Sequence, residues 1–185
     1  MTRILLTLGF LSLLVMGATL CLGLAIGDLY AEPSQQTLRL ATAHRLAGTA
    51  AALMVVFVES IVVTYFIGTS RWCREVVQTY QLDPAPAEAS QRLKRRAFPL
   101  ALAGMLVVVA VGALGAASDP ATGRPGTHDW VKIHLVAAIS GFGFIAWTYY
   151  MAWNYIASNH AIIGQIVAEV ARVRRERGLD LGENS

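Results

Sequence analysis

The sequence predicts an all-α fold, an integral membrane four-helix bundle with cytoplasmic helical extensions. Four long apolar runs occupy residues 4–26, 46–67, 98–117 and 134–156. Each run is long enough to cross a bilayer core about 30 Å thick as a helix that rises about 1.5 Å per residue. In addition, only 15% of the residues are charged, whereas a soluble domain carries about 25%. We expect residues 1–185 to form a single transmembrane domain.

The first run, residues 4–26, is predicted to be a retained transmembrane helix. Arg3 followed by an apolar stretch resembles a secretory signal peptide, but the stretch is longer than the apolar region of most signals. The residues just before Cys21 also lack the small side chain of a lipoprotein cleavage site. Gly23 and Gly27 form a GxxxG pattern, which lets helices approach closely in lipid. We therefore expect this helix to pack inside a bundle.

The second run, residues 46–67, is predicted to be a helix that His44 opens and that carries Glu59 near its middle. A carboxylate in lipid is costly unless it is neutral, paired or hydrated, so an intramembrane acid is a functional candidate. Glu59 has two interpretations. It either holds helices together through one hydrogen bond, or it belongs to a proton or quinone pathway. The candidate hydrogen-bond partners of Glu59 are the hydroxyl groups of Ser60, Thr64, Tyr149 or Tyr150.

The third and fourth runs are predicted to be helices with breaks before and between them. The prolines of segment 84–86 mark the middle of the loop that precedes residues 98–117. Segment 119–126, which begins with Asp-Pro and ends with Pro-Gly, separates that run from residues 134–156. His134 opens the fourth helix, and glycines in both helices predict close packing.

Two amphipathic segments outside the runs are predicted to be helical extensions. Residues 71–80 continue the second helix, and the tail, residues 160–177, places apolar side chains at helical spacing before a basic end. The two segments could pack together or lie on lipid headgroups, and we favour simple extensions of the membrane helices.

The distribution of Lys and Arg predicts the orientation in the membrane. Eleven of the 15 basic residues lie at the N-terminus, between residues 69 and 97, or in the tail. By the positive-inside rule both termini and residues 71–96 are cytoplasmic, whereas residues 28–45 and 118–132 face outside. We expect a multi-pass protein of the cell inner membrane, with the lipid bilayer as a partner. No nucleic-acid motif accompanies the basic residues, so nucleic-acid binding is not expected.

The histidines point to the most specific function. His44 and His134 begin helices that run in the same direction, so both imidazoles should lie at similar depth near the outer face. The helical faces beneath them offer small residues. These residues are Gly48 and Ala51 on the second helix and Ala138 and Gly141 on the fourth. Such faces leave room for a flat macrocycle, and a b-type haem needs axial histidines with an apolar shell. The pattern predicts haem b with His44 and His134 as the iron ligands.

Other interpretations of the histidines are open. A histidine at a membrane interface often only hydrogen-bonds to water or headgroups, and small residues are common at helix interfaces. His128, in the outer loop, is the alternative haem ligand, or it belongs to a metal site with Asp129. His160 lies towards the other face and is assigned to the tail.

Two short segments resemble haem-binding families. Residues 42–48, Thr-Ala-His-Arg-Leu-Ala-Gly, and residues 133–135, Ile-His-Leu, resemble the ligand-bearing helices in one half of haem A synthase, a four-helix bundle with a histidine pair on its second and fourth helices. The first segment also resembles the His-Arg-x-x-Gly entry of cytochrome b subunits in succinate dehydrogenases. The chain departs from haem A synthase at Ala41, where that family has a glutamate.

The resemblance implies haem ligation by His44 and His134 but not haem hydroxylation. In quinone-reactive subunits, an arginine near the membrane interface serves the quinone, which makes Arg45 a candidate for that role. A quinone is therefore a second expected partner.

Two functions from different classes follow. The first is a membrane haem b electron-transfer protein or subunit. The second is a cofactor-free membrane accessory or scaffold subunit of a larger complex, whose basic segment, Arg92 to Arg96, binds anionic lipid or another membrane subunit. A redox carrier or accessory subunit is expected rather than a stand-alone enzyme, and no catalytic residue is assigned. A proton-coupled transporter centred on Glu59 ranks third, because four helices without inverted repeats make a thin transporter.

Overall fold

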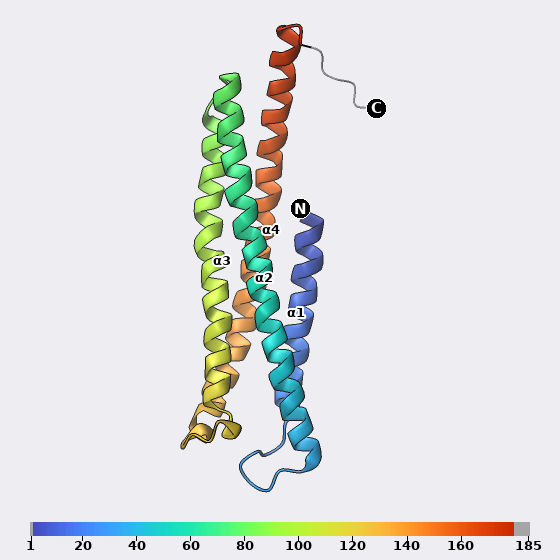
Figure 1. Ribbon diagram of the computed structural model, residues 1–185, viewed down its shortest axis with the longest axis vertical. Coiled ribbons are helices and arrows are strands. Elements are labelled where there is room, and N and C mark those ends of the chain that lie inside the picture. Colours follow the sequence, from blue (N-terminus) through green and yellow to red (C-terminus); the bar gives the residue numbers. More distant parts are fainter. Residues whose placement is uncertain (1, 180–185) are drawn as a thin grey trace.

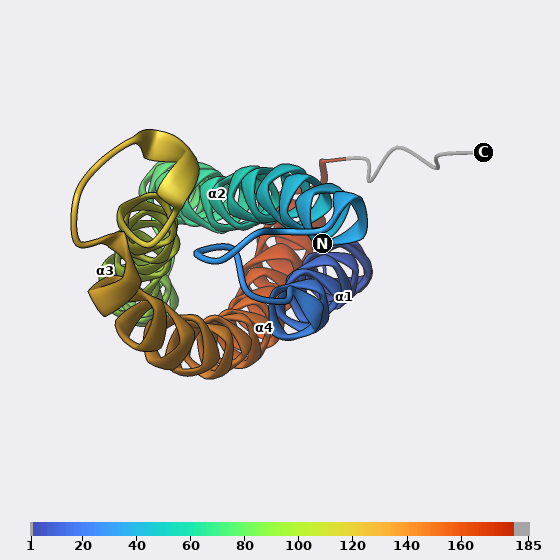
Figure 2. The same ribbon diagram turned by 90° about the horizontal axis from the view of Figure 1, so that it is seen from below.

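The computed structural model describes residues 2–179, and within them four long helices each run antiparallel to the helix before (Figure 1). The helices are α1 (Thr2–Ala25), α2 (Gln35–Tyr80), α3 (Ala85–Ala117) and α4 (Val131–Glu176), with the short 3-10 turns η1 (Pro120–Thr122) and η2 (Thr127–Trp130) before α4. No strand occurs within residues 2–179, so the all-α prediction is confirmed. Seen end-on, the helices follow one another around a ring, which places α2 and α4 diagonally (Figure 2).

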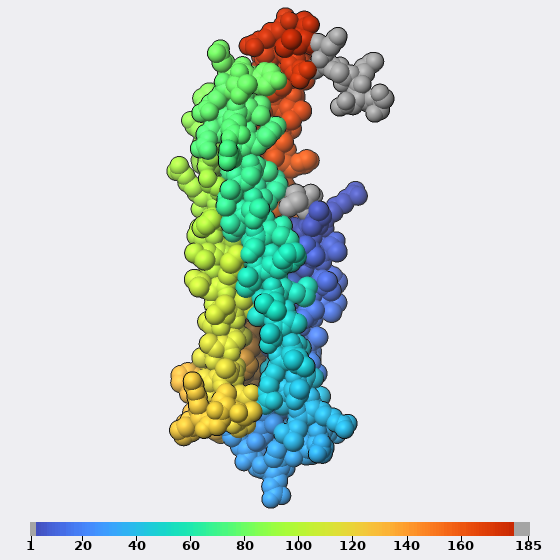
Figure 3. All heavy atoms as spheres, in the orientation of Figure 1, coloured from blue at the N-terminus to red at the C-terminus, as the bar shows by residue number. Residues whose placement is uncertain are grey.

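The two ends of the bundle differ. At one end lie the connections 26–34 and 118–130, and we call it the double-loop end. At the other, the hairpin end, residues 81–84 join α2 to α3. The helices α2, α3 and α4 continue well past the first residues of α1 towards the hairpin end (Figures 1 and 3).

All four helices are long and apolar enough to cross a membrane, by length and composition. Each of them also presents large apolar side chains on the outside of the bundle. Side chains with more than half of their surface exposed include Phe10 on α1, Leu53 on α2, Leu106 on α3 and Val136 on α4. A continuous apolar exterior is uncommon on soluble monomers and is typical of surfaces that contact lipid or another protein.

Helix α2 begins earlier than the sequence analysis expected. Ser34 caps it, because the Ser34 hydroxyl accepts a hydrogen bond from the backbone N–H of Thr37 at 3.1 Å. The helix therefore starts at Gln35, and His44 lies in its third turn. The prediction that His44 opens the second helix was wrong, whereas His134 does lie in the first turn of α4.

The long loop expected around residues 84–86 is also absent from the described residues, and this prediction was wrong. Gln81 adopts the left-handed conformation that ends α2, with φ of 56°. Pro84 and Pro86 then stand at the start of α3, where proline costs no hydrogen bond because the first turn of a helix has no partner for its N–H groups. Pro99, in the interior, does not end α3 either.

The predicted extensions are continuous helix, since α2 runs to Tyr80 and α4 to Glu176. They pack together, with the first turns of α3 as a third member. Their shared core has Cys73, Val77, Ala87 and Ile166 at its centre, all at most 7% exposed. The larger core of the bundle lies between this extension and the double-loop end and includes Val55, Val58, Phe66, Ile145 and Ile156.

Candidate functional site

His44 and His134 meet inside the bundle near the double-loop end. Their ring centroids are 6.2 Å apart, and the ring planes lie at 78° to each other. The two rings come from the diagonal pair of helices, α2 and α4. The structure therefore brings together the two residues that the sequence analysis selected as iron ligands.

The His44 ring is held by the backbone of α1. Its Nδ1 atom lies 3.0 Å from the backbone oxygen of Thr19. A carbonyl oxygen can only accept a hydrogen bond, so the contact assigns the proton to Nδ1. In the neutral ring, the Nε2 atom of His44 then carries the lone pair that a metal ligand needs.

A glycine lies against each imidazole, and the two glycines come from α1 and α3. A Cβ atom built on Gly23 would be 2.9 Å from Cε1 of His44, and one built on Gly115 would be 3.1 Å from Cε1 of His134. Both distances are shorter than an ordinary van der Waals contact, so each ring occupies space that only glycine leaves open. The sequence analysis treated Gly23 as a helix-packing residue and did not connect it with a histidine.

The second imidazole is less completely bonded than the first. Nδ1 of His134 is buried and makes no hydrogen bond with any residue between 2 and 179. The His134 ring also interacts with the backbone of Val111. The pair is thus asymmetric, because Nδ1 is hydrogen-bonded to the backbone in His44 but not in His134.

The small residues that the sequence analysis placed beneath the histidines lie mostly against neighbouring helices. A Cβ atom on Gly48 would contact Thr19 of α1 at 3.6 Å, and one on Gly141 would contact Val111 of α3 at 3.0 Å. Ala51 is buried and Ala138 is half-buried. The two glycines therefore permit close approach of α1 to α2 and of α3 to α4.

Arg45, the candidate quinone residue, forms a bidentate ion pair with Asp119. Its Nε and one terminal nitrogen donate to the two carboxylate oxygens at 2.6 and 2.9 Å. Tyr30 adds a second link, because its hydroxyl donates to the backbone oxygen of Ser118 at 2.6 Å. The ion pair thus joins the connection 118–130 to α2, and the Tyr30 hydrogen bond joins the same connection to the connection 26–34.

His128 lies on the connection between α3 and α4, and the structure brings it to Tyr30. The two rings meet edge to face with their centroids 5.0 Å apart. Among residues 2–179 no group of three His, Cys, Asp or Glu side chains is placed to hold a metal ion, so nothing there supports the metal site expected with Asp129. His160 is exposed on the distant part of α4.

Glu59 is buried at the middle of the bundle, 1% exposed. Its Oε1 atom accepts a hydrogen bond from the Thr148 hydroxyl of α4 at 2.8 Å, and a Cβ atom on Gly104 of α3 would be only 2.7 Å away from that oxygen. Its Oε2 atom is buried without a hydrogen bond to any described residue. One oxygen of the carboxyl group thus accepts a hydrogen bond from α4 and lies in close contact with α3.

The partners expected for Glu59 were wrong. The Ser60 hydroxyl donates to the backbone oxygen of Val56, and the Tyr149 hydroxyl lies 3.0 Å from that of Ser12. Thr148, the residue before Tyr149, takes the role instead.

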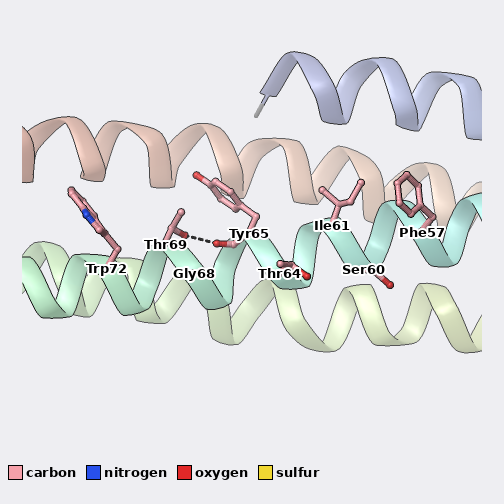
Figure 4. A pocket seen from close by; sticks show the side chains of 8 residues that line it. All are labelled: Phe57, Ser60, Ile61, Thr64, Tyr65, Gly68, Thr69 and Trp72. Atoms are coloured by element: carbon pink, nitrogen blue, oxygen red, sulfur yellow. Dashed lines mark hydrogen bonds between the residues drawn. The ribbon is translucent and has the colours of Figure 1, made fainter. Parts of the chain in front are cut away.

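A second buried polar group, which the sequence analysis missed, lies nearer the hairpin end. The Asn159 amide donates to the hydroxyls of Tyr65 and Thr69 and accepts from Ser90, so it joins α4 to α2 and α3. Tyr65 and Thr69 also line a groove of about 570 Å³ along α2, between Phe57 and Trp72 (Figure 4). The network ties the bundle together where α1 is absent.

The chain matches no protein-family model, and neither a curated protein nor a solved structure matches it. The paired imidazoles, the ion pair beside them and the buried carboxyl group are the features from which a function is inferred.

Proposed function

We propose that the chain is a multi-pass protein of the inner membrane that binds haem b between His44 and His134, near the outer face, and transfers electrons. It acts as a redox carrier or as a redox subunit, with a quinone or another membrane subunit as its partner. The observation that carries the proposal is the approach of the two imidazoles to a centroid separation of 6.2 Å from diagonal helices.

This separation fits two imidazoles that share one iron ion. A metal–nitrogen bond is about 2 Å long, so His44 and His134 at this separation would be close enough to hold one haem iron between their rings.

The contacts around His44 also fit ligation. A metal-bound histidine nearly always donates its other ring N–H to a carbonyl or carboxylate, which fixes the ring and makes it a better ligand. The contact between Nδ1 of His44 and the Thr19 carbonyl has this form. Gly23 and Gly115 allow the rings to lie where they do without a clash.

A bound b-type haem would supply one-electron chemistry at the iron. The chain's own residues would hold the two ligands, limit their rotation and surround them with apolar helix faces. The guanidinium group of Arg45 is engaged in the ion pair with Asp119, so Arg45 could bind a quinone only if that ion pair opened. The role of Arg45 towards a quinone is therefore part of the proposal and is separate from haem ligation.

The membrane part of the proposal is supported by the apolar exterior and by charge. All four helices meet the length and hydropathy of membrane spans. The basic residues between 69 and 97 and those of the tail, ten of the 15, belong to the hairpin end, which the positive-inside rule assigns to the cytoplasm. The histidine pair would then lie near the outer face.

Absorption spectroscopy of the purified protein tests the proposal. We expect a Soret band that shifts on reduction, and we expect His44→Ala and His134→Ala to lose it while His128→Ala and His160→Ala keep it. A protein that stays colourless after reconstitution with haem would refute the proposal. Equal haem content in all four variants would refute the ligand assignment.

A cofactor-free accessory or scaffold subunit is the second candidate. It is favoured by the three-helix extension, which has a core of its own and many basic residues and so offers a separate surface for another subunit. A centroid separation of 6.2 Å also suits two aromatic rings in direct edge-to-face contact. This function predicts a colourless protein in which both histidine substitutions affect only stability.

A further inference from the structure

We propose that the groove between α3 and α4 at the base of the extension binds one anionic phospholipid, with its phosphate on Arg92 and Arg96. The groove has a volume of about 410 Å³. It is lined mainly by Arg92, Leu93 and Arg96 of α3 and by Ser158, Ala161 and Ile162 of α4. The proposal rests on the membrane location in the proposed function and is independent of haem.

The two arginines project from one face of α3, since they are four residues apart. Arg92 lies 3.8 Å from Glu88, but both side chains are well exposed, 63% and 67%, so this ion pair is weak. Arg96 makes no ion pair with any residue between 2 and 179. The groove therefore presents two cationic groups whose charge the described chain leaves largely uncompensated.

The floor of the groove is apolar, which distinguishes it from a site for a free anion. Leu93 and Ile162, which line the groove with the two arginines, are partly buried, and Ala161 lines it beside them. The Ser158 hydroxyl donates to the backbone oxygen of Asn154, so the arginines are the groups left to bind an anion. An amphiphile gains from both parts of such a groove, whereas inorganic phosphate gains only from the charges.

The groove lies at the level along the bundle where lipid headgroups are expected. Arg96 comes two residues before the apolar run that starts at Phe98, and Ser158 comes two residues after the run that ends at Ile156. The cationic groups thus stand at the boundary between apolar and polar chain. Basic pockets between helices at this level are typical sites for anionic headgroups on the cytoplasmic side.

Native mass spectrometry of the full-length protein tests the proposal, with palmitoyl-oleoyl phosphatidylglycerol as probe and phosphatidylcholine with the same chains as reference. We expect one phosphatidylglycerol to bind more tightly than phosphatidylcholine. Because each basic residue near a membrane surface contributes about 1 kcal/mol, Arg92→Gln and Arg96→Gln should each weaken binding about fivefold, and together about twenty-five-fold. Arg96→Lys should restore most of the loss.

Arg95→Gln is the matched control, because Arg95 belongs to the same helix and carries the same charge but does not line the groove. We expect it to bind within twofold of the unmodified chain, whereas Ala161→Leu, which narrows the floor without changing charge, should weaken binding. Equal losses in Arg95→Gln and Arg96→Gln, equal affinity for both lipids, or displacement of the lipid by inorganic phosphate at equal potency would overturn the proposal. Release from membranes by alkaline carbonate would instead contradict the membrane location, and the Soret band of the same sample reports on haem separately.

Discussion

Single glycines set the position of the two imidazoles. Gly23 and Gly115 each contact the Cε1 atom of a histidine from the adjacent helix, so the ring pair depends on backbone that carries no side chain. A side chain there would push the ring away from its present place. The glycines are therefore as specific to the candidate site as the histidines themselves.

Gly115→Ala is expected to weaken haem binding about 10- to 100-fold, the range seen when a group that orients a metal ligand is lost. The added methyl group would lie 3.1 Å from Cε1 of His134 and would displace the ring. Haem titration followed by absorbance measures the effect. Gly112→Ala, on the same helix, meets no atom within 4 Å and should bind haem normally. Equal affinity in the two variants would contradict the role of Gly115.

Glu59 is expected to act mainly as a hydrogen-bond acceptor in the bundle. Glu59→Gln keeps an oxygen for the Thr148 hydroxyl and should cost about 1 kcal/mol or less of unfolding free energy. Thr148→Val should cost about 1–3 kcal/mol, because it leaves that buried oxygen without a donor. Unfolding by sodium dodecyl sulfate in mixed micelles measures both values. A Gln variant as unstable as the Val variant would show that the acid itself is needed.

Thr148 illustrates which residue contacts the sequence could not predict. The cost of a carboxylate in lipid identified Glu59 as a special residue. Its partner depends on the rotation of α4 about its axis and on its height against α2, and one residue of rotation separates Thr148 from Tyr149. Apolar runs fix neither quantity, so the neighbouring tyrosine was expected instead.

At the scale of elements, hydropathy predicted the four helices but not where α2 and α3 begin. The apolar runs mark only the segments with the hydropathy of a membrane span, whereas α2 begins with a cap at Ser34, in polar sequence. The Pro-Ala-Pro segment was interpreted as a loop, although proline at the first turn is a normal helix start. Both errors arose because polar helix outside the runs has no hydropathy signal.

The three-helix extension is expected to have a stability of its own. Ile166 is 2% exposed in its core, and Ile166→Ala should cost about 2–5 kcal/mol locally. Hydrogen exchange should then rise in residues 71–90 and 160–176, while the Soret band expected under the proposed function stays unchanged. Val167→Ala changes the next residue, which is 51% exposed, and should leave exchange unaltered. Similar exchange in the two variants would contradict a packed extension.

For the whole molecule, the asymmetry between the two ends is the property that links fold and function. The double-loop end holds the histidine pair and the Arg45–Asp119 ion pair, and the hairpin end holds most of the basic residues. If the chain spans a membrane, these features face opposite compartments. Under the proposed function, electron transfer would take place near one surface, and anionic lipid would bind near the other.

Cysteine labelling tests this orientation in intact cells. In a chain carrying Cys21→Ser and Cys73→Ser, Thr122→Cys places one thiol at the double-loop end, and Asp83→Cys places one in the turn at the hairpin end. A membrane-impermeant maleimide should label the first variant in spheroplasts and the second only after lysis, because the positive-inside rule holds the basic hairpin end in the cytoplasm. The reverse pattern would place the histidine pair near the inner face, and its electron partner would then have to be sought on the cytoplasmic side. Labelling of both variants in sealed spheroplasts would contradict a spanning bundle.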